Sequence, residues 1–309
     1  MDFPRADLPR ADLPLDRAAG DFPLSRALAG HFEYLAEAGS TNDVLVSAAT
    51  GTDAAAWPDL SVVVTDNQTR GRGRLGRTWL APTGKALAIS VLLRPALPGG
   101  QSLPPHRLGW FPLLAGAAMT RAVQAVVTDG LAAAAQEAAA RPAAEVREEE
   151  HPDHAVSLKW PNDVLIDGYK VSGILSELLP DASGIVIGAG LNVSLDEHDL
   201  PTLTSTSLLL VTGQAPSPDA VLAGYLTELF RLYRGFLAAA ADPEASGLHA
   251  EVTELCGTLD STVRVELPGG ADLIGRATSI DTLGRLVVAD QNDGEPIAVA
   301  AGDVTHLRH

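Results

Sequence analysis

The order of hydrophobic and polar residues divides the chain into strand-like and helix-like stretches. β-Branched or alternating runs predict strands at 60–65, 86–93, 156–160, 164–166, 169–178 and 184–187. Apolar residues spaced three and four apart predict helices over 108–140 and from about 217 to 233. Ser40-Thr41-Asn42-Asp43 has the composition of a helix start, and Asp167-Gly168 that of a two-residue hairpin turn. This mixture predicts an α+β body with a mixed β-sheet and packed helices.

The two ends of the chain have patterns of their own. Residues 1–30 contain a Pro-Arg-Ala-Asp-Leu tandem repeat, which predicts a flexible Pro-rich arm. After residue 256 the pattern changes to short alternating strands at 263–267, 286–288 and 297–299, with a Pro-Gly-Gly turn, which predicts a small β-barrel. We therefore expect an arm at 1–30, a main domain at 31–255 and a barrel domain at 256–309.

One segment of the main domain fits neither pattern. Residues 141–154 contain three consecutive glutamates and two prolines, which predicts an inserted mobile loop. His151 and His154 in this loop have neither cysteines nearby nor a fixed helical face, so a metal site there is disfavoured.

Composition narrows the class of protein. With 309 residues, 46% of them hydrophobic, the chain can bury a large core, whereas its net charge of -17 disfavours nucleic acid as the main partner. The first residues lack the features of an export signal, and no long uninterrupted apolar run predicts a membrane helix, so we expect a cytoplasmic protein. The single cysteine, Cys256, is expected to be a core thiol.

The glycine- and arginine-rich stretch 71–79 is the strongest local exception to the acidic composition. Arg70, Arg72, Arg74 and Arg77 fall within eight positions, interleaved with Gly71, Gly73 and Gly76, directly after a predicted strand. Glycine allows close backbone approach, and arginine offers paired donors that match phosphate and carboxylate oxygens. The stretch predicts a loop that binds a small anion and closes over it.

Other nucleotide-binding and catalytic motifs fit the sequence poorly. The Gly-x-Gly-x-x-Gly spacing matches the dinucleotide fingerprint, but that fingerprint has to open a helix, and here a strand is predicted next. The sequence also lacks a Walker lysine motif and a Gly-x-Ser-x-Gly elbow.

Lysine is scarce in this chain. Only Lys85, Lys159 and Lys170 occur among 22 basic residues, so arginine serves wherever a general positive charge suffices. The three lysines are therefore candidates for positions that need a compact point charge.

Four motifs in order resemble those of biotin protein ligases, in the form without a helix-turn-helix repressor domain. They are the Gly71–Trp79 stretch, Lys159-Trp160-Pro161-Asn162-Asp163, Lys170-Val171-Ser172-Gly173-Ile174-Leu175-Ser176-Glu177 and Gly188-Ala189-Gly190-Leu191-Asn192. The resemblance runs from about residue 38 to the end. It implies a class II synthetase-like body, an SH3-like barrel at the carboxyl end, and a reaction in which biotin and MgATP give biotinyl-5′-AMP, which then acylates a lysine.

The resemblance also implies roles for individual residues. The expected catalytic residues are Lys170, Lys159 and Asp163, with Asp163 also the candidate Mg²⁺ ligand. The expected biotin-binding residues are Ser40, Thr41, Asn42, Gln68, Arg72, Gly73, Arg74 and Lys170. The expected ATP or adenylate contacts are Arg72, Arg74, Arg77, Trp79, Lys159, Asn162, Asn192 and Arg308. Alternatives remain for several of them: the Ser40 triplet is also an ordinary helix cap, Asn162-Asp163 is also common turn chemistry, and Trp79 is equally suited to a core.

Partners and rival functions follow from the same resemblance. The implied acceptor is a biotin carboxyl carrier protein or domain of an acyl-CoA or pyruvate carboxylase, and the enzyme is expected to be a monomer or homodimer without DNA or membrane partners. A lipoate protein ligase of the same fold is one alternative. A nucleic-acid-binding module that uses the arginine-rich loop is the alternative from another class.

Overall fold

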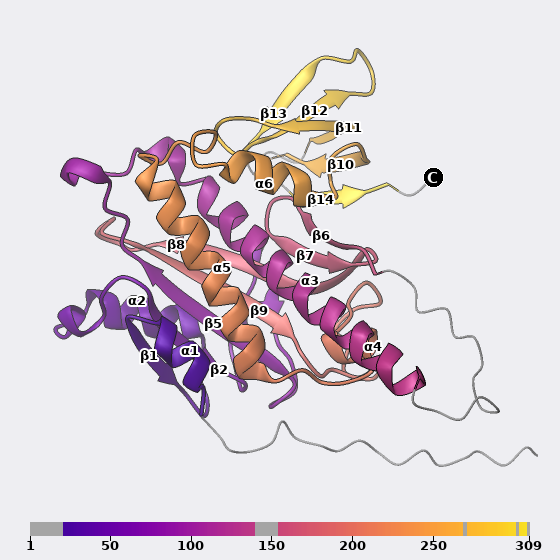
Figure 1. Ribbon diagram of the computed structural model, residues 1–309. Coiled ribbons are helices and arrows are strands. Elements are labelled where there is room, and N and C mark those ends of the chain that lie inside the picture. Colours follow the sequence, from indigo (N-terminus) through magenta and orange to yellow (C-terminus); the bar gives the residue numbers. More distant parts are fainter. Residues whose placement is uncertain (1–20, 140–153, 268–270, 301–302, 308–309) are drawn as a thin grey trace, which may run out of the picture.

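A seven-stranded mixed sheet forms the centre of the computed structural model, which describes residues 21–139, 154–267, 271–300 and 303–307 (Figure 1). Its strand order is β1-β2-β5-β9-β8-β7-β6, with β1 and β2 parallel and the other neighbours antiparallel. The strands are β1 (His31–Tyr34), β2 (Ser61–Thr65), β5 (Ala86–Leu93), β6 (Val156–Lys159), β7 (Asp163–Ile166), β8 (Tyr169–Leu178) and β9 (Ile185–Asn192). The predicted mixed sheet is confirmed.

Helices cover both faces of this sheet. The long helices α3 (Trp110–Ala139) and α5 (Pro218–Ala238) lie side by side across one face (Figure 1). Helix α2 (Thr41–Thr50) packs on the other face, where Leu45 joins Val63, Leu92 and Val186 in a separate buried cluster. The remaining helical segments are α1 (Pro23–Leu28), α4 (Leu208–Thr212), α6 (Leu248–Leu255) and the 3₁₀ turns η1 (Ala54–Ala56), η2 (Arg74–Gly76), η3 (Pro98–Gly100) and η4 (Pro105–Arg107).

The hairpin between β7 and β8 forms where the sequence predicts it. Asp167 and Gly168 both have positive φ angles, 51° and 81°, as a tight hairpin turn requires. Strand β9 is longer than predicted, because Gly188-Ala189-Gly190-Leu191-Asn192 continues the strand to Asn192. The glycines of this motif therefore belong to the sheet itself.

The carboxyl-terminal part is a five-stranded antiparallel sheet in the order β13-β12-β11-β10-β14. Its strands are β10 (Thr262–Glu266), β11 (Asp272–Ile280), β12 (Leu286–Asp290), β13 (Pro296–Val299) and β14 (Asp303–His306). The predicted small β domain is thus present, although β11 and β14 were missing from the sequence prediction. Indole nitrogens of the main domain fasten the two parts together: Trp160 Nε1 donates to Gly284 O, and Trp110 Nε1 to Thr282 O, both at 3.0 Å.

The last residues of the expected arm are ordered, which corrects the prediction for 1–30. Pro23–Leu28 form α1, which packs against α5. Ser25 is fully buried and donates through Oγ to Asp219 Oδ1 at 2.7 Å, and Phe22 stacks near Tyr34. The folded body therefore begins before residue 31, while residues 1–20 lie outside the described part of the chain.

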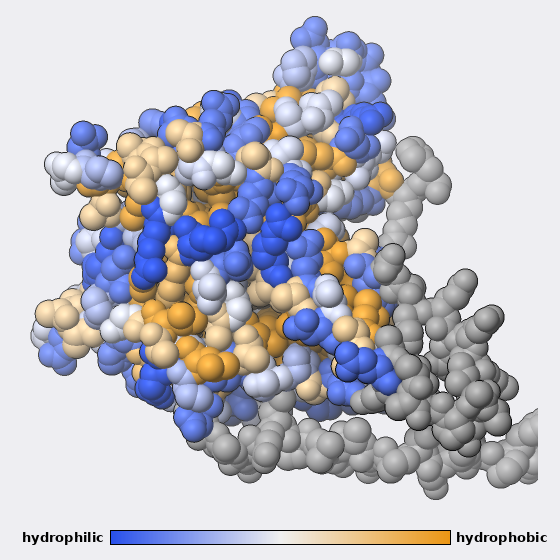
Figure 2. Space-filling model, viewed as in Figure 1, coloured by the Kyte–Doolittle hydropathy of each residue, from blue (hydrophilic) through white to orange (hydrophobic). Residues whose placement is uncertain are grey.

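Helix α3 owes its apolar composition to its place in the core. The stretch Pro105–Ala133 is long and apolar enough to cross a membrane by those two measures, yet 67% of the relevant window is buried inside the protein. The space-filling view shows hydrophilic and hydrophobic residues interspersed over the face that α3 and α5 turn to the viewer (Figure 2). Cys256 is buried as predicted, and this burial raises the pKa of its thiol.

Most of the predicted insertion at 141–154, including His151, lies outside the described residues. Its last member, His154, pairs through Nδ1 with Asp167 Oδ2 at 2.5 Å, at the hairpin turn.

Candidate functional site

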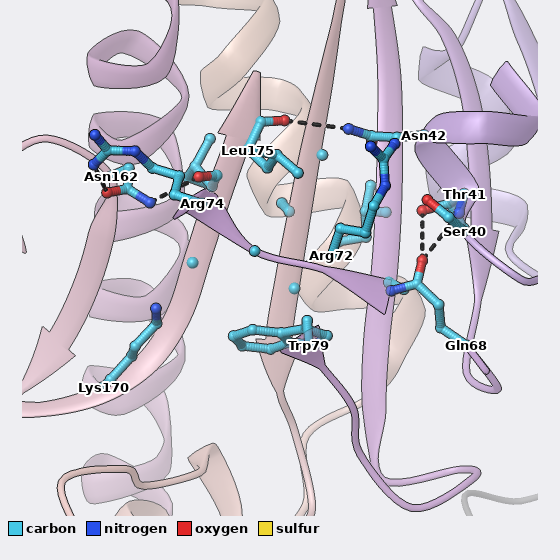
Figure 3. Close-up of a pocket in the computed structure, with 18 residues that line it drawn as sticks. Ser40, Thr41, Asn42, Gln68, Arg72, Arg74, Trp79, Asn162, Lys170 and Leu175 are labelled. Carbon is cyan, nitrogen blue, oxygen red and sulfur yellow. Dashed lines mark hydrogen bonds between the residues drawn. The ribbon is translucent and has the colours of Figure 1, made fainter. Parts of the chain in front are cut away.

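A pocket of about 500 Å³, its open mouth included, lies on the α2 face of the sheet. The floor consists of β5, β8 and β9, α2 begins at one side, and the arginine-rich loop runs across the mouth (Figure 3). Ten of the predicted site residues line this pocket: Ser40, Thr41, Asn42, Gln68, Arg72, Gly73, Arg74, Trp79, Asn162 and Lys170.

Glycines in the floor provide the space for the pocket and for its side chains. A Cβ at Gly190 would lie 2.2 Å from the Trp79 ring, and one at Gly188 would lie 2.5 Å from Asn42 Oδ1. Gly173 pairs with Gly190 across the sheet, and a Cβ there would lie 2.9 Å from Lys170 Nζ. These positions require glycine because pocket side chains pack directly against the backbone, where a Cβ atom would clash.

Uncharged polar groups form one end of the pocket. Ser40 is the N-cap of α2, where its Oγ accepts from Asp43 N, and Gln68 Oε1 accepts from both Thr41 N (2.9 Å) and Thr41 Oγ1 (3.2 Å). Ser40 therefore both caps helix α2 and lines the pocket. This end offers amide and hydroxyl groups already held in place for a neutral polar ligand group.

Asn42 lies deeper in the same region and is 4% exposed. Its Oδ1 accepts from Ser90 Oγ at 2.6 Å, and its Nδ2 donates to Glu177 Oε2 at 2.6 Å and to Leu175 O at 3.4 Å. These partners use its hydrogen-bonding groups, so its main effect is to tie α2 to the sheet at the pocket wall.

The arginine-rich stretch forms a small hairpin over the pocket, which we call the lid (residues 70–79). Its two short strands, β3 (Gly71–Arg72) and β4 (Thr78–Trp79), pair with each other. Arg72 Nη2 binds Asp43 Oδ1 at 2.5 Å and Glu177 Oε2 at 3.1 Å, which fastens the lid to α2 and β8. At the tip, Leu75 has φ of 56° and is 71% exposed.

Arg74 reaches the opposite side of the pocket from Arg72 (Figure 3). Its Nη1 donates to Asn162 Oδ1 at 2.8 Å, and Asn162 Nδ2 donates in turn to Ile174 O at 2.8 Å. Asn162 of the Lys-Trp-Pro-Asn-Asp motif thus holds Arg74 and orients its guanidinium at the edge of the pocket.

Lys170 brings a compact positive charge to the same end. Its Nζ lies 2.7 Å from Asp163 Oδ1 and 5.7 Å from the centre of the Trp79 ring, and its side chain is 33% exposed. A carboxylate and an aromatic face beside the amine give it a defined position. Arg74 and Lys170 make this the cationic end of the pocket.

Four of the predicted residues that the structure describes do not line the pocket: Lys159, Arg77, Asn192 and Asp163. Lys159 lies on β6, next to the carboxyl-terminal sheet, where the burial of His306 and, second, the charge of Lys159 lower the pKa of that imidazole. Arg77 is exposed on the outer side of the lid. Asn192 is 3% exposed and donates through Nδ2 to Thr206 O at 2.9 Å. Arg308 lies outside the described residues.

Asp163, the candidate Mg²⁺ ligand, makes an ion pair through Oδ1 with Lys170 Nζ at 2.7 Å. Among the described residues, no group of three or more His, Cys, Asp or Glu side chains is placed to hold a metal ion. The protein residues here therefore fit poorly as a self-sufficient metal cage.

Two acidic residues at the site were not among the sequence-based candidates. Asp43 and Glu177 hold Arg72, although both stand beside predicted residues in their motifs. A carboxylate three positions after a Ser cap is also ordinary helix-start chemistry, so Asp43 carried no separate signal.

The pocket combines a neutral polar end with a cationic end beneath an arginine-bearing lid. This geometry suits an elongated ligand with an uncharged polar group at one end and an anionic group at the other.

Comparisons with known proteins agree with this geometry. A model of the biotin/lipoate A/B protein ligase family matches residues 39–192. The chain is 35% identical over 298 residues to a Mycobacterium tuberculosis biotin–[acetyl-CoA-carboxylase] ligase, covering 96% of this chain and 97% of that protein. It is 27% identical over 245 residues to the bifunctional ligase/repressor BirA of Bacillus spizizenii, covering 76% of this chain and 63% of that protein.

Solved structures resemble the fold as a whole. A biotin protein ligase from Aquifex aeolicus in complex with biotin and ATP superposes with a TM-score of 0.65 at 22% identity, covering 90% of this chain and all of that one. A Leishmania major biotin protein ligase in complex with biotinyl-5-AMP gives a TM-score of 0.53 at 24% identity, covering 91% of this chain and 99% of that one.

Proposed function

This chain belongs to the biotin/lipoate A/B protein ligase family, and from that premise we propose that it joins biotin to a protein lysine by way of biotinyl-5′-AMP. The observation that carries the proposal is the pocket itself, whose neutral polar end and cationic end match the ureido ring and the carboxylate of biotin. The relative covered almost end to end is named for the same activity.

The polar end favours biotin over lipoate within the family. Ser40, Thr41 and Gln68 present hydroxyl and amide groups that a ureido ring can meet with hydrogen bonds. A dithiolane ring offers no comparable partners, and polar groups left unpaired in a closed site cost about 1 to 3 kcal/mol each. We therefore assign the ureido ring to this end.

The first step joins two anions, so it needs fixed positive charge. In our proposal a carboxylate oxygen of biotin attacks the α-phosphorus of ATP, the bond to the β-phosphate oxygen breaks, and pyrophosphate leaves. Lys170 and Arg74 stand at the end of the pocket where these groups meet, and both are held by polar partners. Charges positioned in advance lower the cost of bringing the two anions together.

The lid keeps the activated product in place. Arg72 fastens one side of the lid and Arg74 the other, so the mixed anhydride would lie beneath it, shielded from water. Trp79 lies beside the Lys170 amine and over Gly190, where its ring is available to stack on adenine.

Magnesium enters this proposal with the nucleotide, where phosphate oxygens and water supply most of its ligands and the ion offsets their charge. Asp163 is the candidate protein carboxylate, but its contact with Lys170 assigns it first to holding that lysine.

The second step transfers biotin to a carrier. The acceptor amine attacks the acyl carbon, the bond to the phosphate oxygen breaks, and AMP leaves, giving an amide. We propose a carboxylase biotin carrier as the acceptor, because two of the relatives are named as ligases for acetyl-CoA-carboxylase. Asp163 is the candidate residue to orient the incoming amine.

One experiment tests the whole proposal. Purified protein is given biotin, MgATP and a carrier domain, and both pyrophosphate release and a mass increase at one carrier lysine are measured, with lipoate in a parallel reaction. We expect biotin-dependent release and biotinylation, both nearly abolished in Lys170→Ala. Release with lipoate alone would assign the chain to the sibling activity, and release with neither would remove the proposal.

The nucleic-acid alternative has less support from the geometry. Arg72 is turned toward Asp43 and Glu177, and Arg74 toward Asn162, instead of presenting a row of donors to a polymer. A mobility shift with duplex DNA that persists at moderate salt would favour this alternative over ours.

A further inference from the structure

The segment that follows β9 runs back beside Lys170 and pairs with the part of β8 that β9 does not reach. We call residues 193–206 the strap. Strand β8 pairs with β9 only from Ser172 onward, opposite Leu191, so β9 does not support the strand at Lys170. The strap fills this place: Lys170 N donates to Thr204 O at 2.8 Å, and Thr206 N donates to Lys170 O at 2.9 Å.

The strap therefore shares in fixing the main chain of Lys170. On its other side Lys170 pairs with Leu165 of β7, where the register shifts. A β-bulge leaves some backbone hydrogen bonds between two strands unformed. The main chain at Lys170 therefore depends more on its hydrogen bonds to the strap. Asn192 ties down the far end of the strap by donating to Thr206 O, which explains its burial away from the pocket.

Lys85 anchors the near end of the strap. Its carbonyl oxygen accepts from Val193 N (3.1 Å) and Ser194 N (2.9 Å), and its Nζ binds both Asp196, at 3.1 Å, and Asp199. Asp199 Oδ2 also accepts from Asp196 N at 3.1 Å, so the two carboxylates and the amine form one small cluster.

The cluster depends on the lysine charge. Without it, Asp196 and Asp199 would face each other as like charges. The hydrogen bond to Asp199 raises the pKa of Lys85, and the hydrogen bond from Lys85 lowers the pKa of Asp196, as expected for charges that stabilise each other. The side chains of Lys85, Asp196 and Asp199 are 33%, 50% and 18% exposed, so the contact with Asp199 is the more shielded of the two.

We propose that Lys85 is a positioning residue: by holding the strap through Asp196 and Asp199, it fixes the strand on which Lys170 presents its amine to the pocket. The effect on the reaction rests on the proposed function, while the effect on the strap does not. This proposal gives Lys85, which does not line the pocket, a structural role.

The test measures amide hydrogen exchange in the ligand-free full-length protein. Lys85→Met keeps the aliphatic stem and the backbone acceptor but removes the charge. We expect exchange to become roughly 5- to 30-fold faster at Thr206 and at Lys170, as for a local loss of one or two kcal/mol, and Lys85→Arg to restore slow exchange. Arg264→Met is the matched control, because Arg264 also lies between two carboxylates, Glu266 and Asp272, but on β10.

A kinetic measurement separates positioning from a general loss of stability. In Lys85→Met the kcat of biotin-dependent pyrophosphate release should fall severalfold while the KM for biotin stays near that of the native protein, because the polar end of the pocket is untouched. Exchange that is unchanged at Lys170, even if the strap itself loosens, would overturn the proposal. If the protein releases no pyrophosphate with biotin, the proposed function fails, and the exchange measurement still decides the role of Lys85.

Discussion

At the scale of single residues, the pocket depends as much on missing side chains as on those present. Gly188 and Gly190 alternate along β9 so that both face the pocket, and Asn42 and Trp79 occupy the space above them. A β-strand places every second residue on the same face, so this Gly-x-Gly spacing clears one face while the residue between packs into the core. Ala189, the intervening residue, is 4% exposed in the main core.

Gly190→Ala should therefore damage the site more than the fold. The new methyl group would lie 2.2 Å from the Trp79 ring, so the ring has to move, and overpacking of this kind costs about 1 to 3 kcal/mol. We expect biotin and nucleotide affinity, measured by calorimetry, to fall roughly tenfold or more. Gly235→Ala is the control, since a Cβ there meets nothing within 4 Å in helix α5. Equal affinity in both variants would show that the Trp79 position is unimportant.

The motif residues at the pocket could be placed from the sequence because each belongs to a short stretch with its own signal. Ser40 carries a capping signal, Lys170 follows a hairpin turn, and Arg74 lies in the glycine-rich loop. Asp43 and Glu177 could not be placed in this way, since their contact with Arg72 exists only when α2, β8 and the lid meet. Contacts between elements far apart in sequence are invisible to local pattern.

At the scale of elements, the lid is a two-point closure. Arg72 fastens it on the side of α2 and β8, and Arg74 on the side of Asn162. The partners of the two arginines lie outside the lid and on opposite sides of the pocket, so the lid can release one side while the other holds. Segments with few buried contacts are the ones that open at low cost, and the exposed Leu75 at the tip fits this description.

Arg74→Ala should open the lid on the side where the intermediate forms. A lost charged hydrogen bond costs about 1 to 3 kcal/mol, so we expect biotinyl-AMP to escape roughly tenfold faster while some adenylate synthesis persists. Release of labelled intermediate from the stoichiometric complex measures this directly. Arg276→Ala, which removes an exposed ion pair with Asp260 on the carboxyl-terminal sheet, should leave the release rate unchanged. A release rate equal to that of the native protein would exclude the lid function of Arg74.

Elements with strong periodicity were predictable, and those without it were not. Strands β2 and β5 are mainly apolar and buried along their whole length, and α5 repeats its apolar face over 21 residues. Strand β11 contains Gly275 and several polar residues, so its alternation of apolar and polar positions is weak. Helix α1 begins at Pro23 and follows a proline-rich repeat, so its composition resembles that of the flexible arm. Their structure comes from tertiary partners: β10 and β12 for the first, α5 for the second.

At the scale of the whole molecule, Lys159 lies near the junction between the main domain and the carboxyl-terminal sheet. It lies on β6, in the motif that also supplies Asn162, and its charge acts on His306 of β14. His306 Nε2 lies 3.2 Å from Thr258 Oγ1, so its ring sits at the junction of the two parts. Protonating this imidazole would place a second positive charge near Lys159.

The attachment of the carboxyl-terminal sheet should consequently weaken in mild acid. Burial, with a smaller contribution from Lys159, lowers the pKa of His306 from its ordinary value of 6.5, so the unfolded chain binds a proton more readily than the folded protein. The stability that neutral His306 contributes is complete above pH 6.5 and is lost as the pH falls below that value toward the folded pKa. We expect the thermal midpoint to drop between pH 7.5 and 5.5, and hydrogen exchange in β10 and β14 to rise with it. His306→Gln keeps a polar side chain without the titration, so the difference between variant and native protein should shrink at acid pH; a constant difference across this range would mean that His306 does not govern the junction.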